Sequence, residues 1–362
     1  MKRIILHIGQ QKTGSTALQY FLEMKKNKLS EKGICYYSPC FRYAPWGGKS
    51  NGDFLLANVL DKLKEPTDPI KKDMFNKNDS LNVFYLLKKN SDQDHFEIEK
   101  INFMHTLKEY DTIILSEEMF FHYDYFYDNF WDVVNDYLHS CTNEELVIDV
   151  LTYLRRQDDW FLAKWKEDVG TPIASSWTFN KALKEYEKFG FLNYYDTLLR
   201  LERVFGRQHL IIRNYDRKQL YNNNIIDDLF HVCDIDFDCG DSNNFNSINP
   251  GRPLTCAYGF SAIDRGLVKT NISRYQLYYG SMQYYRYASE TSRKTQALKN
   301  SERLRLLKRC KANNDKISEH FFDGNNFFDD SIYTEKYDYR VLKSNPLTDI
   351  IFAKILIKNS TI

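Results

Sequence analysis

The sequence lacks the marks of a secreted, metal-binding or nucleic-acid-binding protein. It contains no C-x-x-C pair, and its seven cysteines are an odd number. This pattern argues against a disulfide framework or a zinc knuckle and favours reduced thiols in a cytoplasmic protein. The eight histidines show no metal-ligand spacing. The formal net charge is only +1, so no global attraction to nucleic acid or to an anionic membrane is expected.

The sequence also lacks a long apolar run. The first such run, residues 4–8, is short and leads straight into a glycine-containing loop, so we expect no signal peptide or membrane anchor before it. Residues 350–357 are apolar but too few to span a bilayer. We expect them to form a tail helix packed against the core, with a peripheral membrane contact as the alternative.

The composition is that of a soluble globular protein, with 43% hydrophobic and 27% charged residues. Buried strands are predicted at residues 3–8, 112–115, 146–154 and 209–212, and helical patterns occur between them. This alternation predicts an α/β fold in which helices flank a central parallel sheet. Polar residues follow each strand, at the edge where sheets of this kind bind ligands.

We interpret the chain as one domain over residues 1–362, because no clean linker interrupts it. Residues 65–95 begin with two prolines and continue with many lysines and asparagines, which predicts an exposed insertion. From about residue 255 onward we expect a helical C-terminal portion that is rich in tyrosine.

The first strand leads into a loop at residues 9–16, with the sequence G-Q-Q-K-T-G-S-T, and a helix is predicted from Ser15. Such a turn points backbone N–H groups toward one position, where the helix dipole and a lysine add positive charge. Phosphate is the natural ligand of such a loop. We therefore describe the predicted fold, a central parallel sheet with this loop after its first strand, as P-loop-like. In the kinase-type loop, the lysine follows the second glycine and a magnesium-binding hydroxyl comes next. Here Lys12 precedes Gly14, so the lysine leaves the loop at a different point.

Residues 8–19 closely resemble the loop that binds the 5′-phosphosulfate in sulfotransferases that use 3′-phosphoadenosine-5′-phosphosulfate (PAPS), especially bacterial enzymes acting on carbohydrates. The resemblance implies that Lys12 stabilises the negative charge that grows on the bridging oxygen of the leaving nucleotide. It also implies that no metal is needed, because protein groups balance the charge of the donor. By the same resemblance, the donor is held at this loop by Gln11, Lys12, Thr13, Gly14, Ser15 and Thr16.

Residues 150–160 resemble a second hallmark of this family, in which an arginine at a strand end and a serine eight residues later hold the 3′-phosphate. Arg155 matches the arginine, and a guanidinium suits phosphate because its planar fork reaches two oxygens. Ala163 stands in place of the serine, which removes one hydrogen bond worth roughly 0.5–1.5 kcal/mol. We expect Arg156, Lys164 or a water to compensate.

Other interpretations of these charged residues stay open. The two arginines at the strand end could instead pair with Asp158 or Asp159. Arg252, in the sequence N-P-G-R, is a candidate for a third contact with the donor. Residues 146–149 resemble the strand that holds magnesium in a kinase. The apolar strand continues past Asp149, however, so we interpret that match as a coincidence.

Sulfation of a hydroxyl benefits from a general base that accepts the proton of the acceptor, and two carboxylates are candidates. Glu118 matches the glutamate of an S-S-E segment that is frequent in bacterial family members, with Glu117 in place of a serine. Asp53 precedes a Leu-Ala helix near the place where bacterial relatives often have histidine. The alternatives are a helix cap for Asp53 and a solvated turn for the glutamates. We interpret His7, in the first strand, as a core histidine.

Residues 205–230 and 304–328 also resemble sections of bacterial sulfotransferases, so the resemblance covers nearly the whole chain. It implies PAPS as the donor and a hydroxyl or amine of a glycan or glycolipid as the acceptor. The tyrosine-rich residues 274–287 could stack on sugar rings or pack a helix core, and the net charge argues against single-stranded nucleic acid. Two alternatives remain: a P-loop nucleotide kinase that uses ATP and magnesium, and a non-catalytic descendant that binds nucleotide or glycan.

Overall fold

The structure, a computed structural model, describes most of the chain. The described residues are 1–41, 50–63, 66, 68–69, 71–72, 93–169, 179–188, 190–240, 242–245, 254–264, 267–272, 276–277, 295–296, 300–329, 340–341 and 346–360. Most of the expected insertion at residues 65–95 lies outside this set, as does Arg252, the candidate for a third donor contact.

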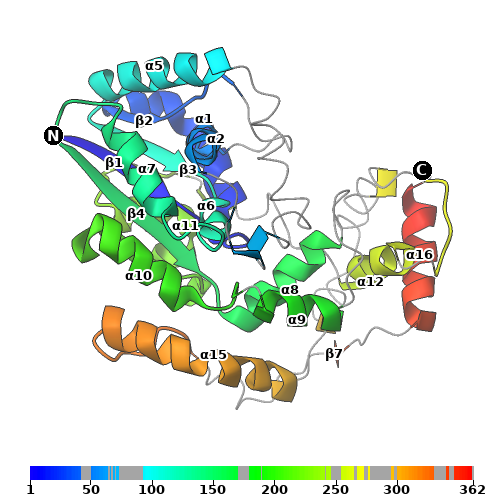
Figure 1. Cartoon of the computed structure of the whole chain (residues 1–362). Helices are drawn as coiled ribbons and strands as arrows, with labels where there is room; N and C mark the ends of the chain where they lie inside the picture. Colours follow the sequence, from blue (N-terminus) through cyan, green and yellow to red (C-terminus); the bar gives the residue numbers. More distant parts are fainter. Residues whose placement is uncertain are drawn as a thin grey trace. The chain divides into compact units, whose positions relative to one another are not determined.

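Five parallel strands form the central sheet, in the order β2-β3-β1-β4-β5 (Figure 1). They are β1 (Lys2–His7), β2 (Ile34–Tyr36), β3 (Thr112–Ser116), β4 (Leu146–Leu154) and β5 (Leu210–Asn214). This arrangement confirms the predicted α/β fold with a parallel sheet and flanking helices. The edge strand β2 was not predicted, because its three residues are too few to give a recognisable pattern.

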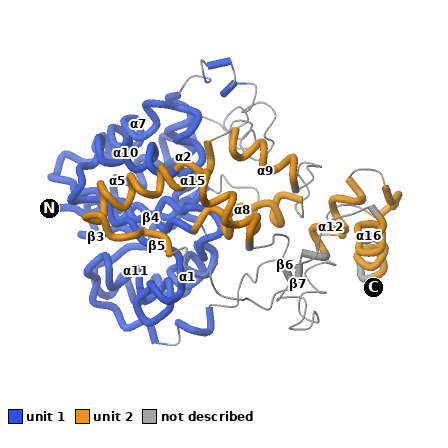
Figure 2. The backbone as a smooth tube through the Cα atoms, turned by 90° about the horizontal axis from the view of Figure 1, so that it is seen from below, with its two compact units in different colours: residues 1–155, 194–249 blue, residues 156–193, 250–362 orange. Residues whose placement is uncertain are grey.

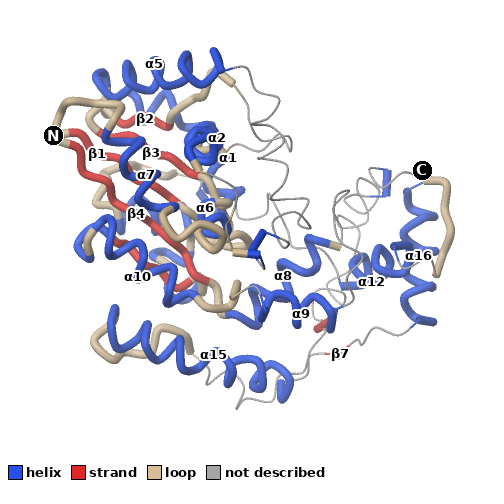
Figure 3. Tube along the Cα trace, in the orientation of Figure 1, coloured by secondary structure: helices blue, strands red, loops and turns tan. Residues whose placement is uncertain are grey.

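The register of the sheet brings the carboxyl ends of its strands together. His7 at the end of β1 is aligned with Ser116 on β3 and with Leu151 on β4. On the other side of β4, Leu154 is aligned with Asn214 at the end of β5. The polar residues that follow β1, β3, β4 and β5 therefore lie along one edge of the sheet. Figure 3 shows the strands of the sheet in red.

Helices α1 (Ser15–Ser30) and α11 (Ile225–Val232) pack against one face of the sheet. Side chains of the strands, such as Ile5 and Leu151, form a buried cluster with Phe21 of α1 and Ile226 of α11. The other helices that accompany the sheet are α2 (Asp53–Lys62), α5 (Gln93–Glu109), α6 (Phe120–Tyr123), α7 (Phe130–His139) and α10 (Tyr194–Phe205). Single 3₁₀ turns occur at Arg207–His209, Arg217–Gln219, Tyr221–Asn223 and Ser242–Phe245.

The chain divides into two compact units, shown in different colours in Figure 2. Unit 1 comprises residues 1–155 and 194–249 and contains the sheet, while unit 2 comprises residues 156–193 and 250–362. Unit 2 contains α8 (Gln157–Asp168), α9 (Phe179–Lys188), α12 (Leu254–Asp264), α15 (Asn300–Phe321), α16 (Pro346–Ser360), and a pair of two-residue parallel strands, β6 (Thr295–Gln296) and β7 (Arg340–Val341). The helical portion expected from about residue 255 belongs to unit 2.

The predicted tail helix is α16, which packs against α12 in unit 2. The two helices approach closely at Gly259, where an added Cβ would lie 3.0 Å from the carbonyl carbon of Phe352. Leu356 and Phe260 join in a small apolar cluster between them. Among the described residues, no helix is both long enough and apolar enough to cross a membrane. A peripheral membrane contact stays a prediction.

Candidate functional site

The loop between β1 and α1 has a backbone that requires glycine at two positions. Gly9 and Gly14 have φ angles of +91° and +82°, in the left-handed region that favours glycine. At Gly14, an added Cβ would lie 2.9 Å from the hydroxyl oxygen of Tyr215, which follows β5. Lys12 also has a positive φ of 66°, which is uncommon for a residue with a side chain. The loop thus places its lysine at an unusual backbone turn two residues before Gly14.

Several side chains of the loop bind within the loop or to the neighbouring strand. Thr13 is fully buried, and its hydroxyl donates a hydrogen bond to the carbonyl oxygen of Gln10 at 2.5 Å. Gln10 is also fully buried, and its Oε1 accepts from the backbone N–H of Arg155 at 3.3 Å. Its Nε2 has no hydrogen-bond partner within the described residues. A buried donor without a partner is uncommon in folded proteins and would be satisfied by an anion.

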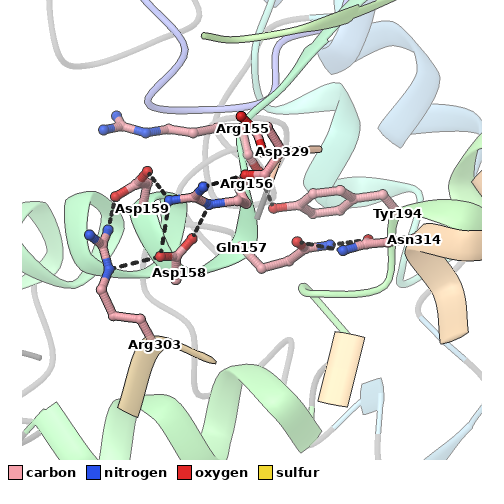
Figure 4. A network of polar contacts seen from close by, with 9 residues as sticks. All are labelled: Arg155, Arg156, Gln157, Asp158, Asp159, Tyr194, Arg303, Asn314 and Asp329. Carbon is pink, nitrogen blue, oxygen red and sulfur yellow. Dashed lines mark hydrogen bonds and ion pairs between the residues drawn. The ribbon is translucent and has the colours of Figure 1, made fainter. Parts of the chain in front are cut away.

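Arg155 connects the end of β4 to this loop. Its Nη1 donates to the carbonyl oxygen of Lys12 at 3.0 Å, and its guanidinium carbon lies 5.8 Å from the ring centroid of Tyr215. Tyr194 donates from its hydroxyl to the carbonyl oxygen of Arg155 at 2.9 Å (Figure 4). The residues predicted to bind the two phosphates of the donor are therefore in direct contact in unit 1. Tyr215 and Tyr194 were not predicted as site residues, because only the tertiary structure brings them to the loop.

The loop also contacts the turn that follows β3. Ser15, the first residue of α1, donates a hydrogen bond from its hydroxyl to Oε2 of Glu118. An added Cβ at Gly9 would lie 3.0 Å from the Cα and Cβ atoms of Glu118, so this turn packs tightly on the loop. A residue predicted to bind the 5′-phosphate and a residue predicted to act as base are thus bonded to each other. We call Gln10, Lys12, Ser15, Glu118 and Arg155 the loop cluster.

The segment before α2 brings the second candidate base to the same strand end. The backbone N–H of Gly52 donates to the carbonyl oxygen of Ser116 at 3.2 Å, and the side chain of Asn51 accepts from the N–H of Ser116 at 2.7 Å. Asp53 is fully buried in the first turn of α2, where its Oδ1 accepts from the N–H of Phe54 at 3.1 Å. The cap position itself is held by Gly52.

Glu117 is a buried carboxyl with a strongly raised pKa. It is 2% exposed, its Oε2 accepts from the hydroxyl of Ser50 at 2.5 Å, and its Oε1 accepts from the N–H of Met119 at 2.9 Å. Burial raises its pKa from 4.5 to about 8, and the nearby charges of Asp53 and Glu118 add to the rise, while the two hydrogen bonds oppose it. A solvated turn was one alternative for the two glutamates, and for Glu117 the structure overturns it, because the side chain is buried.

His7 lies in the core, as the sequence predicts. Its Nδ1 is 2.8 Å from the hydroxyl of Ser116, which also accepts from the side-chain amide of Gln19 at 3.1 Å. Burial lowers the pKa of His7 from 6.5 to about 4, so the ring is neutral near pH 7. The ring packs edge-on against Tyr153, with the centroids 5.9 Å apart. Through the hydroxyl of Ser116, His7 supports the end of β3.

In unit 2, a second group of charged side chains is organised differently (Figure 4). The Nε of Arg156 donates to Asp158 at 2.8 Å, and Arg303 of α15 pairs with the same carboxylate at 2.8 Å. Both arginines also pair with Asp159. We call these four residues the ion cluster. Beside it, the side-chain amides of Gln157 and Asn314 exchange hydrogen bonds. The pairing with aspartates considered for both arginines thus applies to Arg156, while Arg155 contacts the loop.

Other predicted roles can be compared with the structure. Two candidates to replace the missing serine form ion pairs in the structure. Lys164 pairs with Asp168, and Arg156 pairs with Asp158. Asp149 lies within β4, where it accepts from Arg3 at 2.7 Å and lies 2.8 Å from Nδ1 of His209. This supports the interpretation of its magnesium-site motif as a coincidence. No group of three or more metal-ligating side chains occurs in the described part of the chain.

Comparisons with known proteins do not place the chain in a family. No family model matches it, and no solved structure matches it. An uncharacterized protein of Archaeoglobus fulgidus is 32% identical over 90 residues, which are 25% of this chain and 23% of the length of that relative. The chain therefore covers less than a quarter of that relative, and the function has to be argued from the site.

Proposed function

We propose that this protein transfers a sulfuryl group from PAPS to a hydroxyl or amine of a glycan or glycolipid. The observation that carries the proposal is the loop with the sequence K-T-G-S-T, which joins the first strand of a parallel sheet to a helix, with Lys12 ahead of Gly14. The contact between Arg155 and the carbonyl oxygen of Lys12 supports it further, since it joins the residues proposed for the two ends of the donor.

The residues at the loop fit a phosphate-containing donor. Gln10 offers a buried donor group without a partner among the described residues, and Lys12 supplies a positive charge at the loop. The start of α1 adds the partial positive charge of a helix N-terminus. The proposed ligands of the 5′-phosphate remain Gln11, Lys12, Thr13, Gly14, Ser15 and Thr16, and Arg155 is the proposed ligand of the 3′-phosphate. No metal enters this proposal.

The reaction is an in-line displacement at sulfur. The acceptor oxygen or nitrogen bonds to sulfur while the bond between sulfur and the bridging oxygen breaks, and adenosine 3′,5′-bisphosphate leaves. Lys12 stabilises the charge that develops on the bridging oxygen. The proton of the acceptor passes to a carboxylate, for which Glu118 and Asp53 are the candidates. Asp53 is fully buried, whereas Glu118 is partly exposed at the loop. Glu118 is therefore the carboxylate that an acceptor can reach more easily.

A binding experiment tests the donor. Thermal unfolding of the full chain is followed with adenosine 3′,5′-bisphosphate in the absence of magnesium and, in parallel, with ATP and magnesium. A ligand at a hundred times its dissociation constant adds about 2.7 kcal/mol of stability, which raises the midpoint by several degrees. A rise with ATP and magnesium but none with the bisphosphate would favour the kinase and overturn the proposal.

A turnover experiment separates an enzyme from a non-catalytic descendant. The protein is incubated with PAPS carrying a radioactive sulfate and with mixed bacterial polysaccharides and glycolipids, and label in the acceptor fraction is measured. The proposal expects transfer that depends on the protein and that the bisphosphate product inhibits. Tight binding of the bisphosphate with no transfer to any acceptor would instead support the non-catalytic descendant.

A further inference from the structure

The contact between Ser15 and Glu118 places a carboxylate on the phosphate loop. Ser15 is 3% exposed and begins α1, and its hydroxyl donates to Oε2 of Glu118. The N-terminus of a helix carries partial positive charge and stabilises negative groups within its first turn. Glu118 therefore places a carboxylate, from within the chain, against a side chain that the loop sequence predicts to bind phosphate.

The backbone holds this glutamate close to the loop. An added Cβ at Gly9 would lie 3.0 Å from the Cα and Cβ atoms of Glu118 and 3.1 Å from its carbonyl oxygen. The loop also keeps a buried donor, Nε2 of Gln10, that no described residue satisfies. Glu118 thus occupies one hydrogen-bonding group of the loop, the hydroxyl of Ser15, while Nε2 of Gln10 has no partner among the described residues.

The two neighbouring acids have hydrogen bonds to other groups. Both carboxylate oxygens of Glu117 accept hydrogen bonds, from Ser50 and from the N–H of Met119. The carboxylate of Asp53 accepts from the N–H of Phe54 at the start of α2. Glu118 accepts a hydrogen bond from Ser15, which is a predicted phosphate ligand.

We propose that Glu118 is an internal ligand of the phosphate loop, which an incoming anion must displace, and that it thereby sets how tightly the loop binds anions. The identity of the natural anion rests on the proposed function, but the competition between Glu118 and an anion for the loop does not. A ligand that binds one of two states loses affinity by the fraction of the protein in the other state. Glu118 should therefore weaken the binding of every anion that uses the loop by the same factor, about tenfold.

The test compares three variants by isothermal titration with two probes, adenosine 3′,5′-bisphosphate and inorganic pyrophosphate. Glu118→Ala removes the competing group, and Glu118→Gln keeps its size but removes its charge. Glu23→Gln is the matched control, since it removes one carboxylate from the same helix α1, where Glu23 pairs with Lys26. We expect about tenfold tighter binding of both probes by Glu118→Ala, a smaller gain by Glu118→Gln, and no change with Glu23→Gln.

Each result decides for or against the internal ligand. Unchanged or weaker binding of both probes by the Glu118 variants would overturn it, as would an equal gain with Glu23→Gln or the absence of binding by every variant. Tighter pyrophosphate binding without any binding of the bisphosphate would uphold the internal ligand while the PAPS donor fails. Melting curves show which variants are folded; should Glu118→Ala not fold, Glu118→Gln alone decides.

Discussion

The loop cluster of unit 1 and the ion cluster of unit 2 contain the same kinds of residue but use them differently. In the ion cluster, two arginines and two aspartates neutralise one another, and Asp158 is fully buried. In the loop cluster, Arg155 contacts a carbonyl oxygen and Glu118 contacts a hydroxyl, and no charge pair between them is formed in the described structure.

This difference teaches how to separate a structural cluster from a binding site. A set of charges that satisfies itself holds helices together, as Arg303 of α15 does with the two aspartates of α8. A cation that is bound to a neutral group, as Arg155 is to a carbonyl oxygen, can exchange that group for a ligand of opposite charge. Arg155 and Arg156 are adjacent in the sequence, yet they belong to different sets. The comparison predicts that variants of the ion cluster change stability and variants of the loop cluster change binding or turnover.

The largest expected effect is on stability, in the ion cluster. Arg303→Ala leaves the buried Asp158 with one cation fewer, and breaking a buried pair by removing one partner costs about 3–5 kcal/mol. Urea denaturation of the full chain measures the loss. Arg309→Ala is the control, because Arg309 forms an exposed pair with Glu187 that is worth about 0–1 kcal/mol. Equal losses in the two variants would contradict a structural role for the ion cluster.

The next effect is on turnover, in the loop cluster. Lys12→Ala removes the charge proposed to stabilise the leaving nucleotide, and we expect kcat to fall about 10²–10³-fold. Stability should change by no more than about 0.5 kcal/mol, as for ordinary surface substitutions. Lys28→Ala removes an exposed lysine from α1 and should leave kcat unchanged. Undiminished transfer by the Lys12 variant would show that its proposed role is wrong.

A smaller effect is expected for the recognition of the 3′-phosphate. Arg155→Lys keeps the positive charge but loses the planar fork, so adenosine 3′,5′-bisphosphate should bind about tenfold more weakly. Binding of adenosine 5′-phosphate, which lacks the 3′-phosphate, should not change. Titration calorimetry with both nucleotides distinguishes a ligand of the 3′-phosphate from a residue that only supports the loop. Equal weakening of the two would mean that Arg155 acts through its bond to the carbonyl oxygen of Lys12, as a support of the loop.

The sequence predicted the fold because the fold depends on local patterns. The strands β1, β3, β4 and β5 are apolar runs with polar residues directly after them, and the loop is one continuous motif. The edge strand β2 was missed because three residues carry no periodicity. Local pattern therefore sufficed for the sheet and for the position of Lys12.

The partners of the site residues could not be predicted in the same way. Arg155 and Arg156 both follow a strand, and nothing local tells which one meets the loop and which one meets Asp158. The bond between Ser15 and Glu118 joins residues about a hundred positions apart, so it depends on the register of β1 and β3. The burial of Glu117 depends on residues 50–52, which dock on the end of β3.

Glu117 lies beside the loop cluster, and its titration should be visible in the stability of the fold. Its pKa is raised by burial to about 8, so the folded protein keeps a proton that the unfolded chain loses above pH 4.5. Stability therefore falls as the pH rises from about 4.5 to about 8. His7 acts in the opposite sense, because its lowered pKa of about 4 makes stability rise between about pH 4 and pH 6.5. The two slopes oppose each other below pH 6.5.

Between about pH 6.5 and pH 8, the contribution of Glu117 should appear without the opposing contribution of His7. One titrating group gives a slope of at most about 1.4 kcal/mol per pH unit, so the free energy of unfolding should fall by about 2 kcal/mol across this window. Glu117→Gln still accepts a hydrogen bond but does not titrate, and we expect it to remove that slope. Urea denaturation at pH values through the window measures both proteins, with Glu23→Gln as a control that keeps the slope. An unchanged slope in Glu117→Gln would mean that another group carries the proton.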